Sequence, residues 1–168
     1  MKLEITHEID APIDAIELAF LSPEMGAMLG RALAPTVTSV ETTLHEIDSG
    51  LFRRTLRFHA SSPGNAVVAR ALPKGALTWE TRVRYPIGTH TSTWEVLPLE
   101  QYRRYFRASG TYRLEPVAEG RTRRTVAGDV EIFIPLPLMR GIVERLVLAE
   151  VRKTYDAEAE TLRKLATL

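Results

Sequence analysis

The histidines are the residues of this sequence that could carry acid–base or metal chemistry. His7, His45, His59 and His90 lie far apart in the chain, and no two have the i, i+4 spacing that places both imidazoles on one helix face. The sequence has no cysteine, so it offers no thiolate nucleophile or zinc ligand. It also lacks the GxSxG, GxGxxG, P-loop and HExxH motifs. We therefore predict no metal site and no cofactor.

Three ionisable groups fall among residues that are predicted to be buried. His90 follows a stretch of alternating apolar residues, Glu150 lies on the apolar side of a predicted helix, and Arg54 lies in a predicted strand near Glu46. A lone buried charge is costly unless it is paired. We expect Arg54 and Glu46 to reach solvent at a hairpin end, and His90 and Glu150 to pair, to reach solvent at the cavity mouth or to face a ligand.

The composition is typical of one soluble globular domain, which we expect to span 1–168. The chain has 45% apolar and 26% charged residues and a net charge of +1, so no overall field attracts nucleic acid or an anionic membrane. Its longest stretch without a polar side chain, 132–139, is far shorter than the roughly 20 residues of a membrane span. The N-terminus lacks the apolar core of a signal peptide. We expect a cytoplasmic protein without integral membrane association.

The hydrophobic periodicity changes twice along the chain. Strict alternation at 2–9 predicts a half-buried strand, and apolar residues at helical spacing then predict two short helices, at 13–20 and 25–33. Alternating stretches separated by turn residues at 37–133 predict six further strands.

Two more segments complete the predicted arrangement. Residues 61–75 form a longer connection, and the small apolar patch at 64–72, which lies between Pro-Gly and Pro-Lys-Gly hinges, predicts a lid or mouth segment. A long helix follows Pro137 and reaches about Leu165. Its apolar ridge drifts around the helix at i, i+4 steps: Met139, Val143, Val147, Val151, Tyr155 and Ala159.

The turn residues allow the strand registers of three hairpins to be predicted. A three-residue loop at 48–50 gives the pairs Val40–Phe58, Thr42–Leu56, Leu44–Arg54 and Glu46–Phe52. A four-residue loop at 86–89 gives Trp79–Val96, Thr81–Trp94, Val83–Ser92 and Tyr85–His90. A three-residue loop at 118–120 gives Phe106–Ile132, Ala108–Val130, Gly110–Gly128 and Tyr112–Val126. Each register gathers most large apolar side chains on one face.

These registers have two consequences for the inner face of the sheet. They make Trp79 and Trp94 diagonal neighbours there. They also place Gly110 directly opposite Gly128, and two absent side chains leave room above the sheet. This room either accommodates strand bending and a closely passing helix or forms the floor of a ligand cavity.

The order strand, two short helices, six strands and long helix resembles the START-like or Bet v 1-like (SRPBCC) superfamily. The resemblance is sharpest at 110–117, at 120–128 and at 135–138 with the following helix, which look like an uncharacterised bacterial branch. It implies an α+β helix-grip fold, in which a curved seven-stranded antiparallel sheet wraps around the C-terminal helix and encloses a cavity.

The leading functional hypothesis is binding of a hydrophobic or amphipathic small molecule, lipid-like, sterol-like or polyketide-like, between sheet and helix. The inner face, rich in aromatic residues with few polar groups, supports it. The predicted ligand-binding residues are Phe58, Trp79, Val83, His90, Trp94, Phe106, Gly110, Tyr112, Gly128, Met139, Val143, Leu146 and Glu150.

Two alternatives come from the same resemblance. The superfamily also contains polyketide cyclases and aromatases, and in such an enzyme His90 or Glu150 would be the acid or base. It contains chaperone-activating interaction modules as well, which here would use the arginines predicted on the outer sheet face. These are Arg82, Arg84, Arg103, Arg107, Arg113 and Arg123, interleaved with Glu80, Glu115 and Glu131. A solvated face of paired charges is the simpler interpretation. Nothing in the sequence specifies the oligomeric state.

Overall fold

The structure, a computed structural model, describes residues 1–60, 77–133, 138 and 140–168. The predicted lid at 64–72 and the predicted ligand-binding Met139 lie outside these residues.

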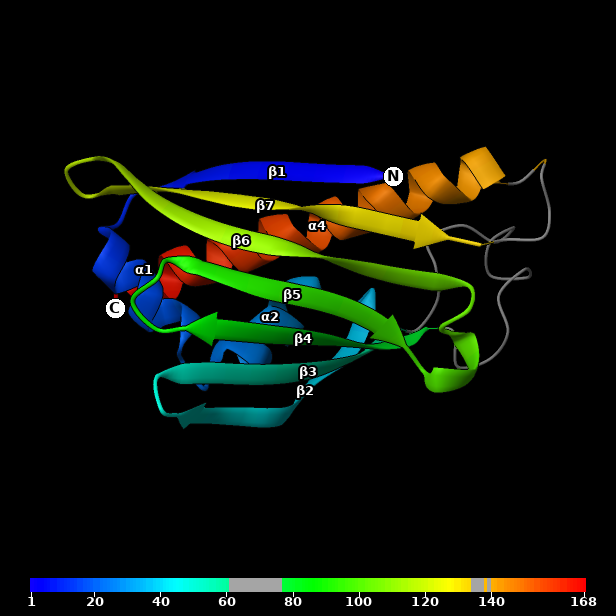
Figure 1. Ribbon diagram of the computed structural model, residues 1–168, viewed down its shortest axis with the longest axis horizontal. Coiled ribbons are helices and arrows are strands. Elements are labelled where there is room, and N and C mark those ends of the chain that lie inside the picture. The colour runs from blue at the N-terminus through cyan, green and yellow to red at the C-terminus, as the bar shows by residue number, and fades with distance from the viewer. Residues whose placement is uncertain (61–76, 134–137, 139) are drawn as a thin grey trace.

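The chain forms a curved antiparallel sheet that packs against a long C-terminal helix (Figure 1). The sheet has seven strands in the order β1-β7-β6-β5-β4-β3-β2. Their bounds are β1 Lys2–Ile9, β2 Val37–Asp48, β3 Leu51–Ala60, β4 Thr78–Pro86, β5 Thr91–Pro98, β6 Phe106–Ala118 and β7 Arg121–Ile132. The helices are α1 Ile13–Phe20, α2 Met25–Leu33, the short 3₁₀ helix η1 Glu100–Tyr102 and α4 Arg140–Ala166. The predicted helix-grip architecture is confirmed.

Helix α4 runs along the inner face of the sheet, and α1 and α2 pack against its C-terminal half (Figure 1). The main core lies between these layers, with Leu3 and Ile5 of β1, Val126 and Val130 of β7 and Leu162 of α4 among its buried residues. None of the helices formed by the described residues has both the length and the apolar character needed to cross a membrane.

The β2–β3 register is confirmed at its open end and wrong near its turn. Val40 pairs with Phe58 and Thr42 with Leu56 as predicted. The turn, however, is Ser49–Gly50 with φ of 51° and 79°, a two-residue connection whose backbone twist matches that of the flanking strands.

Because the turn is one residue shorter than predicted, the strands contain one residue more. A β-bulge between Thr42 and Leu44 accommodates this extra residue. Leu44 therefore lies opposite Thr55 and Glu46 opposite Arg53, whereas the predicted partners were Arg54 and Phe52.

The β4–β5 register is displaced by two residues from the predicted one. Val83 pairs with Trp94, and Trp79 pairs with Pro98. A shift of two keeps every side chain on its face, so both indoles still point inward, but they are not diagonal neighbours. Trp79 instead stacks on Phe58, with ring centroids 5.3 Å apart and planes 4° from parallel.

The predicted β6–β7 pairs are all confirmed, including Gly110 opposite Gly128. The loop itself is Glu119–Gly120, one residue shorter than expected, with an irregularity between Pro116 and Ala118. A Cβ atom on Gly128 would clash with the Ser109 carbonyl oxygen and would lie 2.7 Å from the Trp94 Cζ2 atom. The missing side chain therefore permits close approach of both the neighbouring main chain and the indole ring.

We predict that Gly128→Ala lowers the free energy of unfolding by about 1–3 kcal/mol or more, because the added methyl group clashes with the Ser109 carbonyl and with the Trp94 ring. Denaturant unfolding followed by circular dichroism measures the change. The matched control is Gly141→Ala in the first turn of α4, where a Cβ atom meets nothing within 4 Å. An equal loss of stability in both variants would contradict this account of Gly128.

Candidate ligand-binding interior

Most of the predicted site residues are buried or half-buried. Buried are Phe58, Val83, Trp94, Tyr112 and Val143, and half-buried are Trp79, Phe106, Gly110, Gly128 and Leu146. Except for Phe58 and Trp79, which belong to a second cluster beneath α2, the large side chains pack in or against the main core. His90 and Glu150 lie elsewhere.

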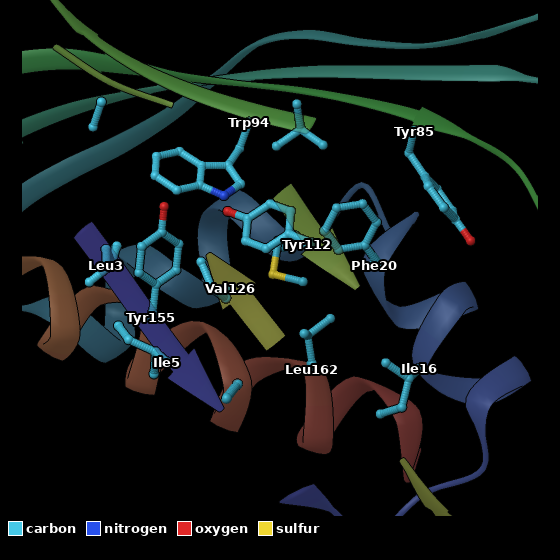
Figure 2. Packing of buried hydrophobic residues seen from close by; sticks show 14 of the residues in the cluster. Leu3, Ile5, Ile16, Phe20, Tyr85, Trp94, Tyr112, Val126, Tyr155 and Leu162 are labelled. Atoms are coloured by element: carbon cyan, nitrogen blue, oxygen red, sulfur yellow. The ribbon is translucent and has the colours of Figure 1, made fainter. Parts of the chain in front are cut away.

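Trp94 lies at the middle of the interior, between the sheet and α4 (Figure 2). Its ring contacts those of Tyr112 and Tyr155, with centroids 6.2 and 5.7 Å away. The indole N–H donates a hydrogen bond of 3.2 Å to the carbonyl of Thr111. The three rings lie together between the sheet and α4. We call Trp94, Tyr112 and Tyr155 the aromatic wall.

The tyrosines of this wall also pair with each other. Their rings meet edge to face, with centroids 5.9 Å apart. Burial is the main cause that raises the pKa of both Tyr112 and Tyr155 above the ordinary tyrosine range, because it disfavours the charged phenolate. The nearby Glu158 carboxylate raises both pKa values further.

A buried ion pair packs against the aromatic wall on the side of the C-terminal half of α4. The Arg124 guanidinium of β7 lies 2.9 Å from the Glu158 carboxylate of α4, and their side chains are only 1% and 8% exposed. Arg124 also donates to the carbonyl of Tyr155 over 3.4 Å, and its guanidinium lies 4.9 Å from the centre of the Tyr112 ring. Charge pairing, hydrogen bonding and cation–π contact thus connect the sheet to the helix.

Sequence reasoning missed this pair although a signal was present. The confirmed β6–β7 register places Val126 on the inner face, and Arg124, two residues earlier, shares that face. Glu158 lies three residues after Tyr155 on the same helix side. The inner face of the sheet and the facing side of the helix are both mainly apolar, but Arg124 adds a positive charge to the first and Glu158 a negative charge to the second. This arrangement could have indicated that Arg124 pairs with Glu158.

Arg54 is a second buried arginine, contrary to the expectation that it reaches solvent. It is 3% exposed and donates a hydrogen bond of 2.6 Å to the carbonyl of Phe20, at the end of α1. Its guanidinium lies 4.9 and 5.5 Å from the ring centres of Phe20 and Phe52. The expectation failed because α1 covers this end of the sheet, while Glu46 pairs with Arg53 instead.

The interior beside the ion pair is filled by side chains. A cavity of about 10 Å³ remains there, which is room for about one water molecule. It is lined by Ile16, Phe20, Tyr85, His90, Ser92, Tyr112, Leu114, Arg124 and Leu162. A ligand larger than water therefore cannot occupy this end of the described interior without displacing core residues.

The structure does not bring His90 and Glu150 together. His90 lies in the β4–β5 turn rather than opposite Tyr85, because the register is displaced, and its Nε2 atom is 3.9 Å from Glu17. Glu150 is exposed on α4. The prediction that Glu150 lies on the inner side of the helix is wrong, since the drift of the apolar ridge turns this position outward.

Among the residues that the structure describes, the large apolar side chains in the N-terminal half of α4 are mostly only half-buried. Leu146, Val147 and Val151 are half-buried against the main core, as are Val96 of β5 and Phe106 of β6. Three large apolar side chains at this end are exposed: Phe133, Leu138 and Ile142.

The outer sheet face carries paired charges, as the simpler interpretation predicted. Arg57 and Arg82 lie 2.9 and 3.0 Å from Glu80, and Arg123 lies 3.2 Å from Glu8. The further pairs are Arg107–Glu131 and Arg113–Glu115. Arg103 is not on this face as predicted, because it follows η1 and donates to the carbonyl of Pro98.

We predict that Glu158→Ala lowers the free energy of unfolding by about 3–5 kcal/mol, because it leaves the Arg124 charge buried without its partner. Glu160→Ala, two residues along α4, removes an exposed ion pair with Arg163 and should cost far less, because solvent screens such pairs. Denaturant unfolding compares the two variants. Similar losses in both would show that burial of the Arg124–Glu158 pair contributes nothing.

We predict that the protein loses stability as the pH rises above about 10, the usual pKa of tyrosine. The pKa values of Tyr85, Tyr112 and Tyr155 are raised in the folded state, so only the unfolded chain releases these protons there. Tyrosinate absorbance should therefore increase together with the loss of near-ultraviolet circular dichroism. Tyr112→Phe should weaken the pH dependence. Ionisation of these three tyrosines in a protein that stays folded would contradict the burial.

Comparisons with known proteins agree with this architecture. The family model described as protein of unknown function DUF2505 matches residues 4–165. No protein of curated function matches the sequence. Among solved structures, TTHA0849 from Thermus thermophilus has a TM-score of 0.68 at 19% identity, covering 96% of this chain and 97% of the other.

Two further solved structures show the same fold. The aromatase/cyclase Zhui from Streptomyces sp. R1128 has a TM-score of 0.67 at 15% identity, covering 99% of this chain and 93% of the other. A START superfamily protein from Mycobacterium smegmatis has a TM-score of 0.60 at 15% identity, with 98% of each chain covered. The chain belongs to the DUF2505 family of proteins of unknown function, and its fold is the helix-grip fold of START and Bet v 1 proteins.

Proposed function

We propose that the protein binds an apolar or amphipathic small molecule between the inner face of the sheet and the N-terminal half of α4. One contrast within α4 carries the proposal: its more apolar half is its less buried half. Leu146, Val147 and Val151 are only half-buried, whereas the C-terminal half buries Glu158 and Thr161.

This contrast is the reverse of what folding alone favours. Burial of hydrocarbon is favourable at roughly 25 cal/mol per Å², and burial of polar groups is costly. A helix selected only for stability would cover its apolar half first. Incompletely covered hydrocarbon beside a packed core is therefore suited to a ligand that completes the burial.

The aromatic wall gives the proposed site an inner end. The Trp94 indole donates to a main-chain carbonyl, and the Arg124 charge is paired with that of Glu158. The three rings are only 3–4% exposed, so a ligand would meet the wall at its edge. The apolar part of the ligand would contact the wall, and any polar group would point toward solvent at the N-terminal end of α4.

The solved structures of the same fold support small-molecule binding. One structure of norcoclaurine synthase from Thalictrum flavum contains dopamine and hydroxybenzaldehyde. Its identity to this chain is 14%, so the likeness concerns the fold and carries no ligand identity. Binding without catalysis is the better supported function, because His90 lies beside Glu17 at the other end of the molecule and the Glu150 side chain is exposed on α4 instead of facing the sheet.

We predict that a hydrophobic fluorophore or a fatty acid binds saturably, near one molecule per chain, and changes tryptophan emission through Trp94. Val147→Asp should weaken this binding by about tenfold or more, because a charge on the apolar surface must be desolvated by the ligand. Fluorescence titration measures the affinity. Thermal unfolding of the same variant verifies that it is folded.

The matched control is Leu18→Asp, which places the same charge at a 71% exposed leucine on α1. It should bind like the unmodified protein. Weak, non-saturating binding by the unmodified protein, or equal losses in a folded Val147→Asp and in Leu18→Asp, would overturn the proposed site.

A further inference from the structure

Three side chains of metal-ligating type, two from one helix and one from a distant turn, meet at the end of the molecule opposite the N-terminus of α4. Asp14 and Glu17 come from α1, and His90 comes from the β4–β5 turn (Figure 1). Each offers one ligand atom, and these atoms all lie within 4.8 Å of one another. Among the residues described, they are the group of three that could hold a metal ion.

The Glu17 carboxylate is held in a fixed orientation. Its Oε1 atom accepts hydrogen bonds from the Tyr85 hydroxyl, at 2.6 Å, and from the Gly88 N–H, at 2.9 Å. Its Oε2 atom lies 3.9 Å from the Nε2 atom of His90. One oxygen thus anchors the side chain and the other faces the imidazole.

The position of His90 depends on an uncommon backbone conformation. Its φ is +58°, in the left-handed region that only a few per cent of non-glycine residues adopt, with asparagine, aspartate and histidine the most frequent of them. The His90 carbonyl accepts a hydrogen bond of 2.9 Å from the Leu114 N–H, which holds the turn against β6. Asp14 and Glu17 share one side of α1 through their i, i+3 spacing. The two elements therefore present their donors to one point.

We propose that Asp14, Glu17 and His90 form a site for a divalent first-row transition metal ion such as Zn²⁺. One imidazole and two carboxylates match the mixed nitrogen and oxygen ligands of such ions, whereas Mg²⁺ and Ca²⁺ prefer oxygen alone. Three protein ligands leave at least one coordination position for water.

Binding requires a small closure of the site. Ligand bonds of about 2.0–2.2 Å bring neighbouring donor atoms to about 3–3.4 Å, so the donors must approach by about 1–2 Å. Asp14 is exposed and the His90 side chain is 36% exposed, so both can move toward the anchored Glu17. The bound ion joins α1 to the β4–β5 turn. The ion thereby stabilises the folded state, because the unfolded chain has no preformed site for it.

This inference is independent of the proposed small-molecule site, which lies at the other end of α4. The competing explanation is a simple histidine–carboxylate ion pair. The chain contains such a pair in His59 and Glu41, whose Nε2 and Oε1 atoms are 3.8 Å apart. No third donor of the described residues joins that pair. It provides a matched control.

The test is calorimetric titration of the untagged protein with ZnCl₂. We expect one Zn²⁺ ion per chain and an increase in the thermal unfolding midpoint with Zn²⁺. His90→Asn removes the imidazole and keeps a residue that tolerates positive φ. It should weaken Zn²⁺ binding by about tenfold or more, since even groups outside the ligand set typically contribute about 10–100-fold.

Asp14→Asn should weaken binding as well, and His59→Asn should leave both the affinity and the midpoint shift unchanged. Thermal unfolding without metal verifies that each variant is folded. The absence of stoichiometric binding would overturn the proposal. So would an equal loss in His59→Asn and His90→Asn, because binding would then depend on histidine content rather than on this cluster.

Discussion

The ion pair between Arg124 and Glu158 is the interaction on which the arrangement of sheet and helix depends. It connects β7 to α4 across an otherwise apolar interface, and Tyr112, Tyr155 and Trp94 pack around it. A hydrophobic contact tolerates sliding, but a buried charge pair has one satisfactory geometry. We infer that the pair sets the position of α4 along the sheet, and that the positions of the aromatic rings follow from it.

This constraint divides the interior into two unequal halves. On the side of α1 and α2, core side chains leave a cavity of only about 10 Å³, and Tyr85, the Gly88 main chain and His90 surround Glu17 at the surface. On the other side, the apolar residues of α4, β5 and β6 are half-buried. The Arg124 and Glu158 charges are paired at the boundary between the two sides, and hydrocarbon predominates on the open side. The two proposed sites therefore lie at opposite ends of one helix and can be tested separately.

Local patterning determined much of the fold in advance. Alternation at 2–9 specified the first strand, and the apolar ridge of the C-terminal segment specified the long helix that reaches about Leu165. The β6–β7 register was correct because a slip of one residue would expose Tyr112 and Val126. Both tryptophans were placed on the inner face for the same reason, although the β4–β5 register was displaced by two, since parity alone decides the face.

The tertiary structure alone decided which charges are buried and which donors meet. The Thr42–Leu44 bulge, the covering of Arg54 by α1 and the outward turn of Glu150 depend on packing between elements rather than on periodicity within one. The Arg124–Glu158 pair and the cluster of Asp14, Glu17 and His90 join residues separated by tens of positions. Spacing along the chain shows which of these side chains share a face, but the curvature of the sheet and the docking of its helices decide which of them meet.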